Sequence, residues 1–187
     1  MRRFVVAAGL ALAAIGLSSC GSSVAAPPST TTTSPVTTTT MAVAAAPCNT
    51  RQLSITTSSN DGMGHIGVVL IFTNASTTPC TEVGYPGVAA LTSTGVQAMQ
   101  AIRTLSGYLV GTPALQTITL AHGESASAIV EGTDVPSGDA TSCPTYPQLL
   151  VTPPNATESV TIDAVLPGCS PIEVHPVVPG VSGMNQR

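Results

Sequence analysis

The sequence predicts an all-β domain, an antiparallel immunoglobulin-like β-sandwich stapled by disulfides, and two observations favour this class. Short apolar segments alternate with turns rich in Gly and Pro, and no long amphipathic helix pattern interrupts them. Aromatic residues make up only 3% of the chain and Trp is absent, so we expect a core of Val, Ile, Leu and Ala on strands. The Cys…Trp…Cys core of true immunoglobulin domains is missing, which limits the prediction to the broader immunoglobulin-like class.

The N-terminus reads as a signal peptide over residues 1–19. A short basic start, Arg2 and Arg3, precedes an apolar run that is shorter than the roughly 20 residues needed to span a bilayer. The run ends in Leu17-Ser18-Ser19-Cys20, which resembles the bacterial lipobox. This resemblance implies cleavage before Cys20 and a diacylglyceryl group on its sulfur. The alternative is an ordinary secreted protein that is cut nearby.

After Cys20, residues 20–47 are rich in Ser, Thr, Pro and Ala and carry no charge, which predicts a disordered linker. Two Thr runs leave O-glycosylation of this linker open. The β-sandwich is expected over residues 48–180 and a C-terminal tail over residues 181–187. A protein with two or more acyl chains is stably anchored, so we expect the domain on the outer face of the cytoplasmic membrane.

The cysteine count supports the lipid anchor. The chain has five Cys, and assigning Cys20 to lipid leaves an even set for an oxidising compartment, Cys48, Cys80, Cys143 and Cys169. Four Cys allow three pairings, and proximity in sequence favours Cys48–Cys80 with Cys143–Cys169. Each such bridge is worth about 3–4 kcal/mol in the chain-entropy model. A zinc site is disfavoured because no CxxC occurs and no His lies three or four residues from a Cys, so we expect no metal and no cofactor.

The elements follow from apolar patterning. Val68 to Phe72 is the most continuous apolar run after the signal peptide and predicts a buried central strand. Val96 to Gly107 is ambiguous: apolar residues recur every third position, so the segment is either a short helix or an irregular connection. Pro176 indicates a strand end or an edge. The other strands are expected at residues 53–56, 87–91, 115–121, 126–130, 146–151, 160–164 and 172–178.

Several motifs together resemble a domain of unknown function that is common in actinobacterial lipoproteins. They run from His65 through Thr73-Asn74, Thr78-Pro79-Cys80-Thr81, Gly84-Tyr85-Pro86-Gly87-Val88, Thr119-Leu120 and Gly123-Glu124-Ser125-Ala126 to Cys143-Pro144, Cys169 and Pro176 to Gly180. The resemblance spans roughly Cys48 to Gly180. It implies a small all-β secreted domain with disulfides, and it implies no activity.

The histidines offer little catalytic chemistry. His65, near Asp61, could act as a general base, but no Ser or Thr stands out as its nucleophile, so we expect a strand-entry His bonded to turn backbone. His122 and Glu124 are expected at a solvated hairpin tip, and His175 is expected to face solvent.

Two further candidates come from the loops. Three acids within nine residues, Glu131, Asp134 and Asp139, permit a calcium site, but their spacing is not that of an EF-hand, and Asp in loops usually serves turns. Tyr85 is expected to pack on the nearby disulfide or cap the core, with ligand contact as the alternative.

Charge narrows the function. Without the signal peptide, three Arg face nine acids, a net charge of about −6, and such a chain cannot neutralise a run of phosphates, so nucleic acid is not an expected partner. No nucleophile, base and orienting group converge in the sequence, so we expect a non-catalytic module rather than an enzyme. It would bind an envelope protein, glycan or lipid. The alternatives are an envelope-acting hydrolase and a purely structural or antigenic surface protein.

Overall fold

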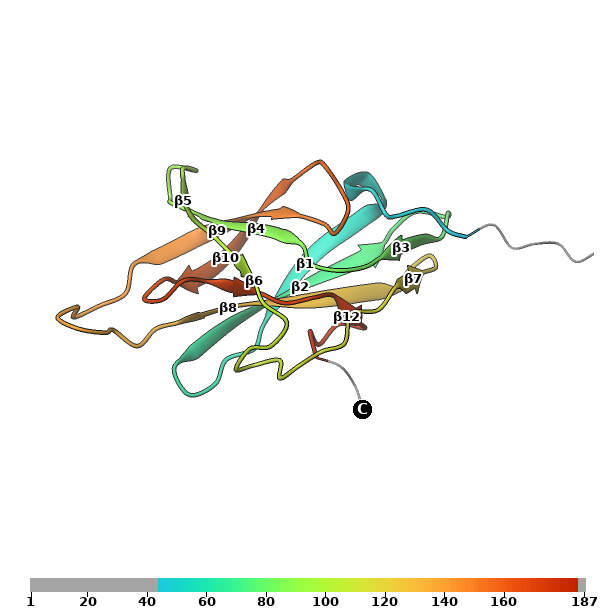
Figure 1. Cartoon of the computed structure of the whole chain (residues 1–187). Coiled ribbons are helices and arrows are strands. Elements are labelled where there is room, and N and C mark those ends of the chain that lie inside the picture. The colour runs from blue at the N-terminus through green and yellow to red at the C-terminus, as the bar shows by residue number, and fades with distance from the viewer. Residues whose placement is uncertain (1–43, 185–187) are drawn as a thin grey trace, which may run out of the picture. The chain divides into compact units, whose positions relative to one another are not determined.

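A computed structural model describes residues 44–184, so the expected signal peptide, Cys20 and most of the linker lie outside the described residues. The described chain is all-β and contains two main sheets, a two-stranded sheet and one short 3₁₀ helix, η1 (Thr50–Gln52) (Figure 1). No helix within residues 44–184 is long and apolar enough to cross a membrane.

The first sheet contains six strands in the order β1-β2-β8-β11-β6, with β12 also paired to β8. These strands are β1 (Leu53–Ser59), β2 (His65–Asn74), β6 (Ile102–Arg103), β8 (Ser125–Thr133), β11 (Glu173–Val174) and β12 (Val178–Pro179). The second sheet has the order β10-β9-β4-β5, from β4 (Gly87–Leu91), β5 (Gln97–Gln100), β9 (Thr145–Thr152) and β10 (Val160–Pro167). A short pair is formed by β3 (Cys80–Glu82) and β7 (Ile118–Leu120).

The core lies between the two main sheets, as expected for a sandwich. Alternate residues of each strand point inward because side chains on a strand have a period of two. From the first sheet the buried cluster takes Val68, Leu70, Phe72, Ala126, Ala128 and Val130, and from the second Val88, Ala90, Leu149, Val151 and Leu166. Phe72 is the only phenylalanine in this cluster, and aliphatic side chains fill the rest, as the composition predicted.

The opposite face of the central strands is covered by the C-terminal segment. Val69 and Ile129 are buried although they point away from the sandwich core. Gly183 lies against both, since a Cβ there would collide with Ile129, and its N–H donates to Ser127 Oγ at 2.8 Å. This cover explains why the central strand is apolar on both faces.

The segment 96–107 is not a helix. It forms β5, antiparallel to β4, and β6, which pairs in parallel with β11 and so departs from a purely antiparallel sandwich. Val96, Ile102 and Leu105 are exposed, so the apolar residues at every third position share no buried face. The backbone instead bonds to both sheets: Ala101 N–H donates to Val88 O and Ile102 N–H donates to Ile172 O, each at 2.9 Å.

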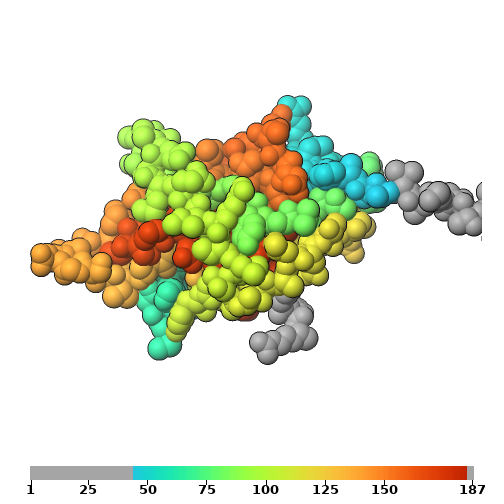
Figure 2. All heavy atoms as spheres, viewed as in Figure 1, coloured from blue at the N-terminus to red at the C-terminus, as the bar shows by residue number. Residues whose placement is uncertain are grey.

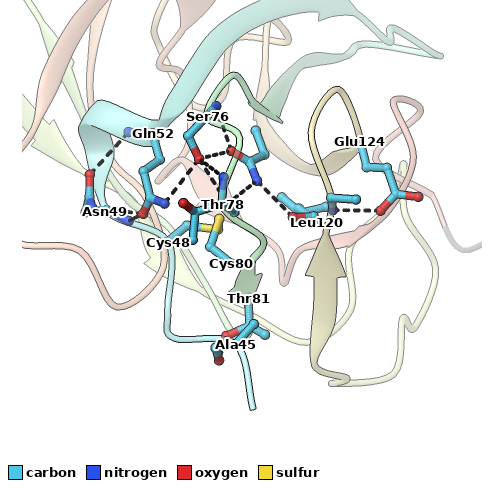
Figure 3. The surroundings of a disulfide bond; sticks show 12 residues. Ala45, Cys48, Asn49, Gln52, Ser76, Thr78, Cys80, Thr81, Leu120 and Glu124 are labelled. Atoms are coloured by element: carbon cyan, nitrogen blue, oxygen red, sulfur yellow. Dashed lines mark hydrogen bonds between the residues drawn. A yellow bond between two sulfur atoms is a disulfide. The ribbon is translucent and has the colours of Figure 1, made fainter. Parts of the chain in front are cut away.

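The first disulfide, Cys48–Cys80, joins the start of the domain to β3 across 32 residues. Both cysteines are buried, and Figure 3 shows them beside the turn that contains Ser76 and Thr78. Two backbone hydrogen bonds run next to the bridge, Cys48 N–H to Thr81 O at 2.9 Å and Thr81 N–H to Ala46 O at 2.8 Å. The chain is therefore already docked on β3 just before Cys48.

Asn74 organises the turn beside that disulfide. Its buried side chain donates to Thr78 O at 3.0 Å and to Leu120 O at 2.9 Å, while its Oδ1 accepts from the Ser76 N–H at 2.9 Å. A buried amide costs stability unless its donors and acceptors are satisfied, and here all are used. The Asn-Ala-Ser sequence at this position therefore serves a turn.

The second disulfide, Cys143–Cys169, closes the open end of the β9–β10 hairpin across 26 residues. It is half-buried. Gly168 N–H donates to Pro144 O at 2.9 Å next to it, and Cys169 N–H donates to Thr133 O of β8 at 3.3 Å. The bridge thus lies where the second sheet contacts the end of β8 in the first sheet. Both disulfides therefore follow the pairing that proximity in sequence favoured.

Candidate functional site

A polar pocket of about 500 Å³ opens where two turns meet the edge strand β6. We call it the Tyr85 pocket, and it is lined by Val83, Gly84, Tyr85, Gly87, Arg103, Thr152, Pro153, Asn155 and Ala156. The Gly-Tyr-Pro-Gly motif supplies one wall, and the turn after β9 supplies another. Tyr85, expected on the disulfide or capping the core, is half-exposed and lies in this pocket.

The walls of the Tyr85 pocket are held by turn backbone. Gly84 has a φ of +90°, a conformation that favours glycine, and its carbonyl accepts from the Val177 N–H at 2.8 Å. Asn155, with a φ of +60°, donates from Nδ2 to Val83 O at 3.1 Å. This hydrogen bond connects the turn after β9 to the Gly-Tyr-Pro-Gly turn, so the two walls of the pocket are fixed relative to each other.

Arg103 gives the Tyr85 pocket its positive charge. Residues 44–184 contain two cationic side chains, Arg51 and Arg103. Arg51 makes a forked ion pair with Glu158, at 3.1 Å from Nε and 3.0 Å from Nη2. The Arg103 side chain has no hydrogen bond or ion pair with any residue in the described range. A guanidinium and a phenol beside one pocket can together hold an anionic group that also carries polar atoms.

A second cluster combines Glu131, Glu173 and His175. Glu131 on β8 lies opposite Glu173 on β11, and the potential ligand atoms of the three residues lie within 4.8 Å of one another. His175 was expected to face solvent, and this expectation is wrong: the residue has 0% exposure. The physical reason is that β11 is inserted between β8 and β6, so this segment is interior rather than a surface tail.

Glu131 fastens the loop between β6 and β7 to the first sheet. Its two carboxylate oxygens accept from the Tyr108 N–H at 2.8 Å and the Leu109 N–H at 2.9 Å. Asp134 and Asp139 are exposed in the following loop, which projects from the surface of the domain (Figure 2), so the three acids considered for calcium do not converge. Among the described residues, Glu131 groups instead with Glu173 and His175.

His65 serves the strand entry, as expected. Its backbone exchanges hydrogen bonds with Gly62 at 2.9 Å each way, and its ring stacks on Tyr108 with centroids 4.0 Å apart. Asp61 Oδ1 accepts from the Gly67 N–H at 3.1 Å, so its carboxylate is engaged away from the imidazole.

The turn between β7 and β8 is exposed, as the sequence predicted, but it joins strands of two different sheets and so does not close a hairpin. His122 Nδ1 lies 3.0 Å from Ser76 O, and Glu124 accepts from the Ala121 N–H at 2.8 Å. Both side chains serve local turn structure.

Glu82 in β3 is a buried acid without a partner. It has 0% exposure, and neither carboxylate oxygen has a hydrogen-bond partner among the described residues. Burial raises the pKa of Glu82 to about 8, because a charge is poorly solvated there. The carboxyl group is therefore largely neutral at pH 7.

The sequence analysis did not identify Arg103 as a pocket residue, nor Glu173 and His175 as members of a buried cluster. Glu173-Val174-His175 alternates in the manner of a strand, which is the only local signal for the cluster. The register that places Glu131 opposite Glu173 joins segments far apart in sequence.

The fold and its two bridges define a small disulfide-stapled β-sandwich domain. A family described as Domain of unknown function (DUF4232) matches residues 48–178, and the chain belongs to this family. This confirms the resemblance that the motifs indicated. No curated protein and no solved structure matches the chain.

Proposed function

We propose that the protein is a lipoprotein, anchored through Cys20 to the outer face of the cytoplasmic membrane, whose domain is a non-catalytic binding module. Its ligand is an envelope component, a glycan or a lipid headgroup, that carries a phosphate or carboxylate group. The observation that carries this proposal is the Arg103 side chain, unpaired within residues 44–184, in the wall of the Tyr85 pocket.

The chemistry of the pocket supports an anionic ligand. Arg presents a planar fork of N–H donors that matches carboxylate and phosphate oxygens. Tyr85 adds an aromatic face and a hydroxyl that can pack against and hydrogen-bond a sugar or headgroup. The domain carries more acids than cations, so its overall charge repels a polyanion. The single guanidinium of Arg103, unpaired within residues 44–184, can instead hold one anionic group.

The arrangement of the other polar groups supports binding rather than hydrolysis. Thr104 Oγ1 lies 3.3 Å from His175 Nδ1. A hydroxyl beside an imidazole is the pair that forms a nucleophile and its general base in many hydrolases. However, His175 is fully buried, and the same Nδ1 faces the Thr104 carbonyl at 3.2 Å. A substrate needs access to both groups, so this pair favours a structural role.

Replacing Arg103 with Gln should weaken anion binding by at least about tenfold, since the charge-assisted hydrogen bonds are lost. The measurement is a titration with inorganic phosphate, and separately with acetate, followed by NMR at the amides of Gly84 and Tyr85. We expect wild-type dissociation constants on the order of 1 mM, as suits a single small group.

Arg51→Gln is the matched control, because Arg51 is already paired with Glu158. The control should bind both anions as the wild type does. Equal losses in the two variants, or no shift at the pocket amides of the wild type, would contradict the proposed site.

Cys20→Ala should move the exported protein from the detergent phase to the aqueous phase on Triton X-114 partitioning, because the acyl chains can no longer be attached. The anion titration of the soluble variant should match that of the wild type. Retention of the variant in the detergent phase would contradict the lipid anchor and leave the pocket prediction intact.

A further inference from the structure

The cluster of Glu131, Glu173 and His175 shares no residue with the lining of the Tyr85 pocket, and its function is independent of that proposal. We propose that these three side chains bind one divalent transition-metal ion of the Zn²⁺ type. The argument rests on the orientation of the imidazole, on the residues that hold the ligands, and on the opening beside them.

The imidazole of His175 directs Nε2 toward a carboxylate. Nδ1 lies 3.2 Å from the Thr104 carbonyl oxygen, which can only accept, and 3.3 Å from Thr104 Oγ1, which can donate or accept. In the tautomer with the proton on Nδ1, the carbonyl receives a hydrogen bond and Nε2 carries a free lone pair. Nε2 has no hydrogen-bond partner among the described residues and lies 3.6 Å from Glu131 Oε1. In that tautomer two buried acceptors face each other, an arrangement that a shared cation would stabilise.

The separation of these acceptors fits a shared metal ion. A distance of 3.6 Å is longer than a hydrogen bond between nitrogen and oxygen. Two ligands at about 2.0–2.1 Å from a tetrahedral Zn²⁺ lie roughly 3.3–3.5 Å apart. Glu173 supplies the third donor within 4.8 Å, and its carboxylate is otherwise held by one long hydrogen bond, 3.4 Å from Thr104 Oγ1.

The ligands are supported in the way metal ligands usually are. A ligating His commonly donates its second ring N–H to a backbone carbonyl, and ligating carboxylates are themselves hydrogen-bonded. Here the Thr104 carbonyl orients His175, and the N–H groups of Tyr108 and Leu109 orient Glu131. The loop approaches closely because residue 107 is Gly: a Cβ there would lie 2.5 Å from both His175 Nε2 and Glu131 Oε1.

An opening next to the cluster provides access. A pocket of about 390 Å³ is lined by Glu131, Glu173 and His65 among others, so it borders two of the three proposed ligand residues. Three protein ligands leave a fourth position that water can occupy from this side. One imidazole and two carboxylates suit Zn²⁺, whereas Ca²⁺ and Mg²⁺ prefer ligands that are all oxygen.

A proton on His175 Nε2 is the competing occupant, because the Nε2–H of an imidazolium or of the other neutral tautomer would also face Glu131. The two occupants differ in the role of Glu173. A metal needs it as a ligand, while an ion pair of His175 and Glu131 does not. Glu173→Gln is therefore the decisive variant, and it replaces a half-buried side chain of nearly the same shape, which keeps the fold intact.

The experiment uses the full chain in detergent, without a histidine tag, stripped of metal by a chelator. We expect one zinc per chain by elemental analysis after desalting, and a thermal unfolding midpoint that rises with ZnCl₂ and returns with EDTA. Cobalt(II) in place of zinc should give the strong visible absorption of tetrahedral coordination.

Glu173→Gln should lower zinc affinity by at least about tenfold, as the loss of one of three ligands does. His122→Gln, in the exposed turn between β7 and β8, is the control and should bind zinc as the wild type does. Failure of the folded wild type to retain zinc, or unchanged affinity in Glu173→Gln, would overturn the proposal in favour of a protonated His175.

Discussion

Replacing Cys48 and Cys80 together with Ala is expected to lower the free energy of unfolding by about 3–5 kcal/mol. The bridge closes 32 residues and ties the start of the domain to β3, so its loss raises the chain entropy of the unfolded state. Both sulfurs are also buried, so their removal leaves unfilled space. Equilibrium unfolding in guanidinium chloride, at matched protein concentration, measures the change.

Cys143→Ala with Cys169→Ala is the matched comparison. This bridge closes 26 residues, a similar loop, but it is half-buried. We expect a loss of about 3 kcal/mol, mainly from chain entropy. We attribute the larger destabilisation expected for the Cys48–Cys80 pair to packing around its buried sulfurs. A larger loss of unfolding free energy from the Cys143–Cys169 pair would contradict this.

Replacing Glu82 with Gln is expected to stabilise the domain by about 3 kcal/mol at pH 7. Burial raises the folded-state pKa to about 8 from a model value of 4.5, so at neutral pH the folded protein must hold a proton that the unfolded chain releases. Each pH unit between these two values costs about 1.4 kcal/mol. Gln keeps the shape of the protonated acid and has no proton to bind.

The sign of the pH dependence provides the test. Below the pKa of Glu82 in the unfolded chain, this carboxyl is protonated in both the folded and the unfolded state, so its burial does not lower the free energy of unfolding through proton uptake. The cost develops as the pH rises from about 4.5 and is complete above about 8. The difference in unfolding free energy between Glu82→Gln and the wild type should therefore be about 1 kcal/mol at pH 5 and grow to about 4 kcal/mol at pH 8.

Asp139→Asn serves as the control for this series, because Asp139 is exposed in the loop after β8. Its stability should follow the wild type at every pH. A difference between Glu82→Gln and the wild type that stays constant from pH 5 to pH 8 would show that a partner stabilises the charged form of Glu82 in the fold.

The fold class, most strands and the favoured disulfide pairing could be predicted from local sequence patterns. Alternation at Leu53 and Ile55, and the apolar run from Val68, are local patterns that follow directly from strand geometry. The pairing of Cys48 with Cys80 could be predicted because closing a short loop costs less chain entropy than closing a long one.

The meeting points of the charged residues depend on how distant strands pack together. His175 is buried because β11 lies between β8 and β6, and Glu131 faces Glu173 through a register that joins strands 42 residues apart in sequence. Arg103 reaches the Tyr85 pocket because β6 pairs in parallel with β11. β6 lies within the segment 96–107, which the sequence left open between a short helix and an irregular connection. Such registers are set by packing of the whole sandwich, and a shift of one residue would turn each side chain to the other face.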